Sequence, residues 1–355
     1  MKKYVQEATD ENIWTSIKNN TFGRNKDIKD FIDGLELIDE SACISLDAKW
    51  GDGKTFFVRQ IEEVLKYVLA NQRADEENPI EKLPSYEYLK DNEMMAKIDL
   101  KHSYLPIYYN AWMYDNHSDP LMSLLLVMTK TCRGVYDTKI DSEKISKKLV
   151  EALATLPISL GEFKANPFTA IEKLQGKSMD ILSLVQTEEE IRERVKGIFN
   201  DIIVERAQKL VIFIDELDRC RPSFAIEMLE RIKHYFDDER VIFVVSLNKE
   251  QLIHTITNYY GSGFDATRYL NKFFDVNINL PAMDKYQKQT LEFSEQQTEG
   301  KFWLYKLAEE LSDYYHLSLR DKLIYKSRIE AVPATTGTYT SLESYFVLLF
   351  VASII

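Results

Sequence analysis

Short apolar runs recur along this chain, and segments with helical periodicity separate them. Two of the runs, at residues 210–214 and 241–245, consist only of apolar side chains, as is typical of parallel strands that helices cover on both faces. The segments at residues 56–69 and 222–236 carry apolar side chains at helical spacing. The pattern predicts an α/β fold with a doubly wound, mostly parallel sheet. The predicted strands lie at residues 42–46, 105–109, 210–214, 241–245 and 276–280.

Two helical regions accompany the predicted sheet. Residues 120–209 read as a helical insertion between strands, with breaks at Pro157 and Pro167, and the chain after Pro281 again reads as helices. Residues 345–355 are apolar almost throughout but shorter than the roughly 17–25 residues of a membrane-spanning helix, so they form either a helix packed on the body or part of a longer element. We predict three parts: an N-terminal segment (1–41), a core with the insertion (42–283) and a helical subdomain (284–355).

The charge and the cysteines narrow the class of protein. The chain has 355 residues and a formal net charge of −12, which repels polyanions and gives no signal for direct nucleic-acid binding. Its three cysteines, Cys43, Cys132 and Cys220, lie far apart and form no C-x-x-C pair, so neither a disulfide framework nor a zinc site is expected. We expect a cytoplasmic protein with no secretory signal and no transmembrane segment.

The first chemical motif lies between the first predicted strand and the helix that follows it. The loop Ala48-Lys49-Trp50-Gly51-Asp52-Gly53-Lys54-Thr55 satisfies the P-loop pattern G-x-x-x-x-G-K-[ST] except at its first position, where Ala48 replaces glycine. Glycines let successive N–H groups turn toward phosphate oxygens. Lys54 is expected to reach the β- and γ-phosphates of ATP, and Thr55 to ligate Mg²⁺. The nucleotide-contacting set is Arg24, Ala48, Trp50, Gly51, Asp52, Gly53, Lys54, Thr55 and Phe56.

A second motif supplies acidic groups at the end of a strand. The run at residues 210–214 ends in Asp215 and Glu216, and ligands of open α/β sheets bind at the carboxyl ends of the strands. We expect Asp215 to hold Mg²⁺ and Glu216 to orient or deprotonate the attacking water. The neighbouring pair Asp218 and Arg219 is either a surface ion pair or part of the site. Asn248 either contacts the γ-phosphate or water, or caps a helix.

Four segments together resemble the KAP family of P-loop NTPases, from about residue 21 to the C-terminus. They are the P-loop, Tyr109-Asn110-Ala111-Trp112, the segment from Asp215 to Pro222, and Tyr269-Leu270-Asn271-Lys272-Phe273-Phe274. The resemblance implies an ATPase core of the STAND or AAA type that acts as an oligomeric switch, in several cases in bacterial defence against phage. Many members carry membrane helices between the P-loop and the acidic strand, where this chain has the helical insertion.

The resemblance also draws attention to three arginines. Arg24 lies in a segment similar to the one that covers the adenine in related ATPases, and Arg320 resembles a lid-helix arginine that contacts phosphate. Arg268 precedes the Tyr269-Leu270 motif and is a candidate for a charge supplied to a neighbouring subunit. Each is alternatively a solvated surface charge. The implied partners are a second copy of the chain or a protein that carries the effector.

Three functions share these motifs. The first is an ATP-hydrolysing switch or assembly ATPase, and the second is a nucleotide-dependent interaction scaffold with negligible turnover. The third is a P-loop kinase, against which the long helical insertion and the absence of an arginine-rich lid both speak. Glu216 separates the first two, because a scaffold that only binds nucleotide has no need for a carboxylate beside the metal.

Overall fold

A computed structural model describes residues 7–75, 79–117, 119–134, 196–197, 207–235, 238–280 and 302–330. Within these ranges the chain forms one five-stranded sheet with the strand order β2-β3-β4-β1-β5, and every pair of neighbouring strands is parallel. The doubly wound α/β fold predicted from the sequence is thereby confirmed. The strands are β1 (Ala42–Asp47), β2 (Tyr104–Asn110), β3 (Lys209–Asp215), β4 (Val241–Leu247) and β5 (Val276–Asn279).

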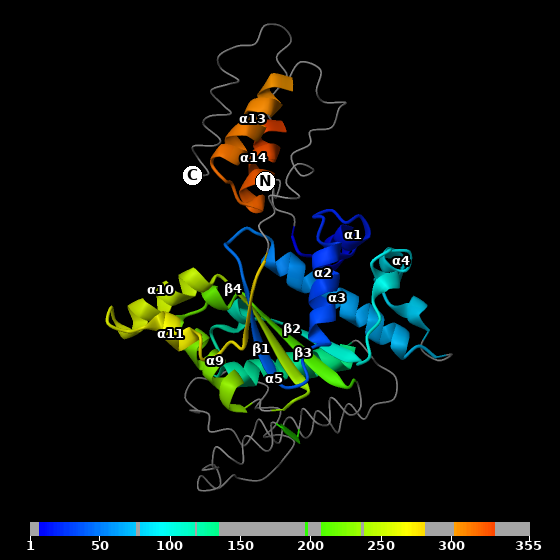
Figure 1. Ribbon diagram of the computed structural model, residues 1–355, viewed down its shortest axis with the longest axis vertical. Helices are drawn as coiled ribbons and strands as arrows, with labels where there is room; N and C mark the ends of the chain where they lie inside the picture. The colour runs from blue at the N-terminus through cyan, green and yellow to red at the C-terminus, as the bar shows by residue number, and fades with distance from the viewer. Residues whose placement is uncertain are drawn as a thin grey trace, which may run out of the picture.

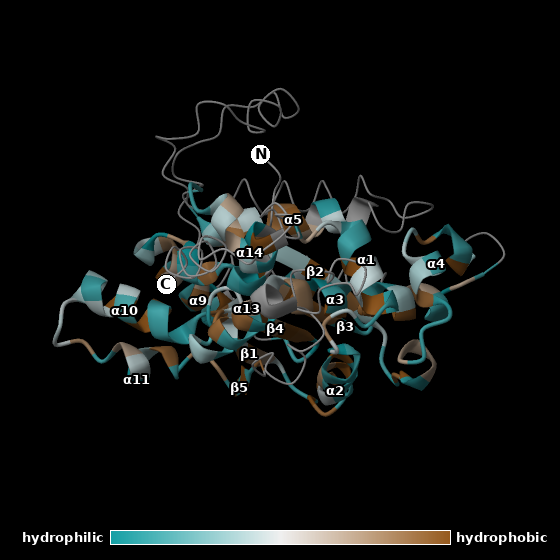
Figure 2. Ribbon diagram, turned by 90° about the horizontal axis from the view of Figure 1, so that it is seen from above, coloured by the Kyte–Doolittle hydropathy of each residue, from teal (hydrophilic) through white to brown (hydrophobic). Residues whose placement is uncertain are grey.

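Helices cover both faces of the sheet (Figure 1). One face carries α5 (Pro120–Gly134), α9 (Pro222–Tyr235) and α10 (Lys249–Tyr260), and α11 (Ala266–Leu270) packs against α10. The other face carries α1 (Asp10–Lys18), α2 (Asn25–Leu35) and α3 (Lys54–Gln72), followed by the short α4 (Tyr86–Leu89). The same layering is seen from above in Figure 2.

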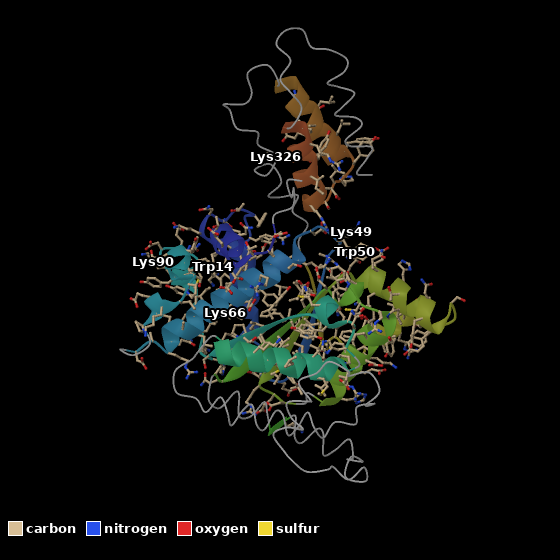
Figure 3. The ribbon with its side chains drawn as sticks, turned by 180° about the vertical axis from the view of Figure 1, so that it is seen from behind. Trp14, Lys49, Trp50, Lys66, Lys90 and Lys326 are labelled. Carbon is tan, nitrogen blue, oxygen red and sulfur yellow. The ribbon has the colours of Figure 1, made fainter. Side chains whose placement is uncertain are left out.

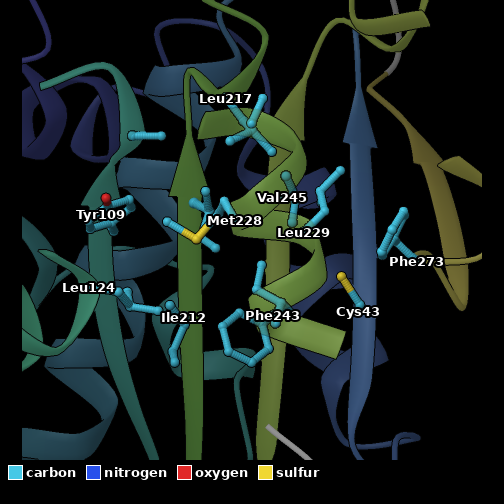
Figure 4. Packing of buried hydrophobic residues seen from close by; sticks show 14 of the residues in the cluster. Cys43, Tyr109, Leu124, Ile212, Leu217, Met228, Leu229, Phe243, Val245 and Phe273 are labelled. Carbon is cyan, nitrogen blue, oxygen red and sulfur yellow. The ribbon is translucent and has the colours of Figure 1, made fainter. Parts of the chain in front are cut away.

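The two central strands explain why their apolar runs are continuous. Successive side chains of a strand point to opposite faces of the sheet. On β3, Ile212 joins the hydrophobic cluster under α5 and α9, whereas Phe213 joins the cluster under α2 and α3. On β4, Phe243 and Val244 divide in the same way, and Figure 4 shows the first of these clusters. Both faces of these strands are buried against helices, so the side chains within the two runs are all apolar and do not alternate between apolar and polar.

The N-terminal segment contains two helices for which the sequence analysis made no prediction. The hydroxyl of Thr9 caps α1 by accepting a hydrogen bond from the main-chain N–H of Asn12 at 3.4 Å. Ile13 and Ile17 are fully buried in the cluster on the α3 side of the sheet. Residues 7–35 are therefore an integral layer of the core and not a loose extension.

Two helices of the predicted C-terminal helical subdomain are described, α13 (Phe302–Tyr314) and α14 (Leu319–Glu330). The hydroxyl of Ser318 accepts a hydrogen bond from the main-chain N–H of Asp321 at 3.3 Å, which caps the start of α14. Most of the predicted insertion, both of its proline breaks and the apolar strip at residues 345–355 lie outside the described residues. Among the described helices, none combines the length and the apolar character that crossing a bilayer requires.

The carboxyl ends of the strands converge at one edge of the sheet. Asn110 is aligned with Asp215, and Asp47 with Leu247, in the parallel register. The Oδ1 atom of Asp47 accepts a hydrogen bond from the main-chain N–H of Lys249 at 2.8 Å, which ties β1 to the start of α10. This edge carries the loops that the sequence analysis singled out.

Candidate functional site

The loop from Ala48 to Thr55 connects β1 to α3 and is shaped by two glycines. Gly51 has a φ of 91° and Gly53 a φ of 80°, in the left-handed region that favours glycine over residues with a side chain. Gly53 occupies the cap position of α3 and has no side chain that could bind the first N–H groups of the helix. Those N–H groups lack acceptors within the helix, so this end of α3 offers the donors that an anion-binding site requires.

The side chain of Lys54 folds over this loop. Its Nζ atom donates hydrogen bonds to the carbonyl oxygens of Ala48 at 2.6 Å and Lys49 at 3.1 Å, and only 9% of the residue is exposed. Burial lowers the pKa of Lys54, while the charges of Asp218 and Asp215 oppose that shift. The structure therefore holds a partly desolvated cation beside the loop. An anion that replaced the two carbonyl oxygens as its partner would form stronger, charge-assisted hydrogen bonds with Lys54.

Asp215 at the end of β3 is held at both of its carboxylate oxygens. Oδ2 accepts a hydrogen bond from the Tyr108 hydroxyl at 3.0 Å, and Oδ1 accepts one from the main-chain N–H of Glu216 at 3.0 Å. The residue is 1% exposed. A buried carboxylate with defined partners has a fixed orientation, as a metal ligand requires.

Glu216 sits in a backbone conformation that is uncommon for a residue with a side chain. Its φ is 61°, which costs about 1–2 kcal/mol relative to right-handed backbone. One carboxylate oxygen accepts a hydrogen bond from Asn110 Nδ2 at 3.2 Å, and the other pairs with Arg219 Nη1 at 2.9 Å. Burial raises the pKa of Glu216, Arg219 lowers it, and Asp215 and Asp218 raise it further. A raised pKa makes the carboxylate a stronger base at neutral pH.

Two tryptophans connect the loops around this edge. The indole Nε1 of Trp50 donates to Asp218, which links the P-loop to the acidic loop across the intervening strand β4. Arg219 lies over the ring of Trp112 at 5.7 Å from its centroid. Of the two readings left open for Asp218 and Arg219, the contacts favour part of the site, since one residue touches the P-loop and the other touches Glu216.

The start of α14 packs directly on the P-loop. A Cβ atom added to Gly51 would lie 2.9 Å from Ser318 Cβ and 3.3 Å from Arg320 Cβ. Figure 3 shows Lys49 and Trp50 beside this end of α14. The structure thus brings Arg320 to the predicted loop, although its phosphate contact stays a prediction.

Arg24 also reaches the P-loop. Its Nη2 atom donates to the carbonyl oxygen of Asp52 at 3.1 Å, and its guanidinium lies over the ring of Phe57 at 5.7 Å. Arg24 is 2% exposed, so it is not a solvated surface charge. Nearby, Phe56 stacks edge-on against Phe22 with ring centroids 5.3 Å apart. These contacts attach the N-terminal segment to the loop.

Two candidates from the sequence occupy other positions. Asn248 accepts a hydrogen bond from the main-chain N–H of Gln251 at 3.2 Å and caps α10, so the structure shows the capping role, and a contact with phosphate or water stays a prediction. Arg268 is exposed on α11. No contact between it and Lys54 or Asp215 is present among the described residues, and its role at a phosphate stays a prediction.

The sequence analysis missed two residues that touch the acidic groups. Tyr108 binds Asp215, and Asn110, quoted above only as part of a motif, binds Glu216. Both lie on β2, which neighbours β3, and they share one face of the strand because they are two residues apart. Their place at the end of a predicted strand was the available signal, but the strand order that puts β2 beside β3 was not readable from the sequence.

The donor set fits a divalent cation that is shared with phosphates. Thr55 offers a hydroxyl and Asp215 a carboxylate, and oxygen ligands of this kind suit Mg²⁺. In the described part of the chain, no group of three or more His, Cys, Asp or Glu side chains is placed to hold a metal alone. Mg²⁺ commonly binds through one or two protein oxygens together with phosphate oxygens and waters, so the residues present fit it.

Comparisons with known proteins identify a family that this chain matches. The KAP family P-loop domain matches residues 24–319, which is more than half of the 355-residue chain. Among solved structures, the ORC2 protein of Aeropyrum pernix, in ADPNP–ADP complexes, aligns with a TM-score of 0.40 and 11% identity, covering 93% of this chain and 67% of that one. The Walker-type ATPase paby2304 of Pyrococcus abyssi aligns with a TM-score of 0.32 and 10% identity, with the same two coverages. A comparison with curated protein sequences gave no match.

The family match spans the P-loop and the acidic strand end, and it ends at Leu319, the first residue of α14. These are the segments that the fold brings together at the carboxyl edge of the sheet. The chain belongs to the KAP family of P-loop NTPases.

Proposed function

We propose that this chain binds ATP with Mg²⁺ at the P-loop and hydrolyses it. The observation that carries the proposal is the convergence of Lys54, Asp215 and Glu216 at one edge of the sheet, although they come from two strand ends separated by β4. A phosphate-binding cation, a metal-binding carboxylate and a base beside it are the parts that phosphoryl transfer to water requires.

Each residue has a distinct role in the proposal. Lys54 would leave the carbonyl oxygens of the loop and pair with the β- and γ-phosphates. Thr55 and Asp215 would hold Mg²⁺, which supplies charge compensation on the phosphates when bound. Glu216 would orient the attacking water and accept its proton. An ionised carboxylate has about four lone-pair sites, so the bonds from Asn110 and Arg219 leave it able to accept another hydrogen.

The contact between α14 and the P-loop supports a switch as the output. Ser318 and Arg320 lie against Gly51, so a phosphate group in the loop would change the surface on which α14 rests. The binding of a second copy of the chain, or of a partner that carries an effector, would then depend on the position of the helical subdomain. The KAP resemblance extends this proposal to assembly or signalling in bacterial defence against phage.

A nucleotide-dependent scaffold with negligible turnover is the second candidate. The ion pair between Glu216 and Arg219, at 2.9 Å, favours it because a paired carboxylate is a weaker base than a free one. Hydrolysis remains the preferred function, since burial acts in the opposite direction and is the largest influence on the pKa of Glu216.

The test is to measure ATP binding and phosphate release for the wild type and for Glu216→Gln. The amide keeps the size of the side chain but cannot accept the proton, so affinity should persist while turnover falls at least about tenfold. Glu250→Gln, on the exposed first turn of α10, is the matched control and should turn over like the wild type. Equal turnover in Glu216→Gln and the wild type would contradict hydrolysis at this site.

A further inference from the structure

Tyr108 contacts the carboxylate of Asp215 from a neighbouring strand. Its hydroxyl donates a hydrogen bond to Oδ2 at 3.0 Å. A tyrosine hydroxyl is a hydrogen-bond donor that suits a carboxylate acceptor. Asp215 receives its other hydrogen bond from the adjacent main-chain N–H, so Tyr108 provides the side-chain contact that fixes the far oxygen.

The ring of Tyr108 is itself held by Arg59. The guanidinium lies 4.7 Å from the ring centroid, a cation–π distance. Arg59 belongs to α3, the helix that begins at Lys54. The helix whose first turn carries Lys54 and Thr55 therefore also contacts Tyr108, the residue that binds Asp215.

Arg59 is in turn fixed by two carboxylates. Its Nη1 atom pairs with Glu62 at 2.5 Å and its Nη2 atom with Asp10 of α1 at 2.6 Å. Glu62 is buried and also pairs with Lys66 at 2.7 Å. Because both ends of the guanidinium are bonded, its plane is set and the ring beneath it has a fixed partner.

The same charged cluster extends to the N-terminal helix. Lys66 pairs with Glu63 at 2.8 Å, and the indole of Trp14 donates to Glu63 at 2.6 Å. Figure 3 shows Trp14 and Lys66 on the same side of the molecule. A continuous set of contacts thus runs from α1 through α3 and β2 to the carboxylate at the end of β3.

We propose that Tyr108 is a positioning residue for the metal ligand Asp215, and that Arg59 holds the Tyr108 ring in place for this purpose. The inference rests on the proposed function, because the orientation of Asp215 matters only if Mg²⁺ binds there with nucleotide. Hydrogen-bond partners of metal ligands orient those ligands, and replacing such a partner costs about 10–100-fold in metal affinity.

The test is calorimetry with a non-hydrolysable ATP analogue over a series of Mg²⁺ concentrations and in EDTA. Tyr108→Phe should require at least about tenfold more Mg²⁺ than the wild type for the Mg²⁺-dependent gain in affinity. Its affinity in EDTA should equal that of the wild type, because the hydroxyl that the variant loses bonds to Asp215 and not to the P-loop. This readout does not depend on hydrolysis.

The neighbouring tyrosine provides a matched control. Tyr109 is fully buried whereas Tyr108 is half-buried, and the Tyr109 hydroxyl bonds to Ser123 at 2.7 Å in the cluster on the opposite face of the sheet. Tyr109→Phe removes the same atom from the same strand without touching Asp215, so its Mg²⁺ response should match the wild type. Equal shifts in both variants would show a general loss of packing and would overturn the inference.

A second variant tests the role of Arg59. Arg59→Lys keeps a positive charge beside Glu62 but loses the planar guanidinium. It should shift the Mg²⁺ requirement in the same direction as Tyr108→Phe but by less. In the Tyr108→Phe background it should add no further shift, since there is no hydroxyl left to place. Additive shifts would overturn the role of Arg59.

The remaining outcomes separate this inference from the proposed function. A normal Mg²⁺ response in Tyr108→Phe, in a chain that needs Lys54 for nucleotide binding, would overturn the inference and leave the proposed function intact. A wild-type chain with the same nucleotide affinity in Mg²⁺ and in EDTA would overturn both.

Discussion

The main-chain N–H of Arg320 donates to the carbonyl oxygen of Gly51 at 3.3 Å, so the first turn of α14 is hydrogen-bonded to the P-loop. The side chain of Ser318 lies on the same glycine. A residue of the helical subdomain therefore contacts the P-loop directly. Gly51 therefore has two roles: its positive φ shapes the loop, and its lack of a side chain leaves room for the first turn of α14.

We predict that Gly51→Ala weakens both nucleotide binding and the seating of α14. The methyl group would meet Ser318, and the φ of 91° is strained for alanine, so stability should fall by at least about 1 kcal/mol. Gly34→Ala in α2 is the control, because its Cβ would meet no atom within 4 Å and should stabilise the helix by about 0.5–1 kcal/mol. Denaturant unfolding and calorimetry measure the two effects, and an unchanged Gly51→Ala would refute the contact.

Arg219 should set the position of the acid limb of the pH–activity profile. Burial raises the pKa of Glu216 and Arg219 lowers it, so removing the arginine leaves the carboxyl with a still higher pKa. The base form is then lost at a higher pH as acid is added. Arg219→Gln should therefore shift the acid limb of turnover upward in pH.

The control for this shift is Arg221→Gln, because Arg221 bonds to Asp115 and not to Glu216. The quantity to compare is the midpoint of the acid limb, which does not depend on any general loss of rate. If the limb stays in place in Arg219→Gln, Glu216 is not the base that titrates there.

We predict that Arg268 completes the site of a neighbouring copy. It is exposed on α11, and related ATPases receive a positive charge across a subunit boundary. Arg268→Ala and Lys54→Ala should each be inactive alone, but a mixture should regain turnover, because the first supplies an intact P-loop and the second an intact arginine. A mixture no more active than its parts would exclude this role.

The sequence was sufficient to predict the elements whose signal is local. Apolar runs located the strands, and Gly53 and Lys54 marked the start of α3, because glycine conformation and helix initiation depend on neighbouring residues. Asp215 was predicted at the end of β3 for the same reason.

The contacts that organise the site depend on packing between distant segments. The bond between Tyr108 and Asp215 needs β2 beside β3, and the seat of Ser318 on Gly51 needs the helical subdomain folded back onto the loop. Neither contact can be predicted from the spacing of apolar residues or from the residue types involved. Asn248 had two plausible roles in the sequence; its side chain caps α10, and its contact with phosphate or water stays a prediction.

The central claim is that the loop centred on Lys54 binds nucleotide, and calorimetry with an ATP analogue and Mg²⁺ tests it most directly. Lys54→Ala removes the partly desolvated cation that we propose pairs with the β- and γ-phosphates, so affinity should fall at least about tenfold while circular dichroism stays unchanged. Lys26→Ala, an exposed helix position, should bind like the wild type. Wild-type affinity in a folded Lys54→Ala variant would contradict the account.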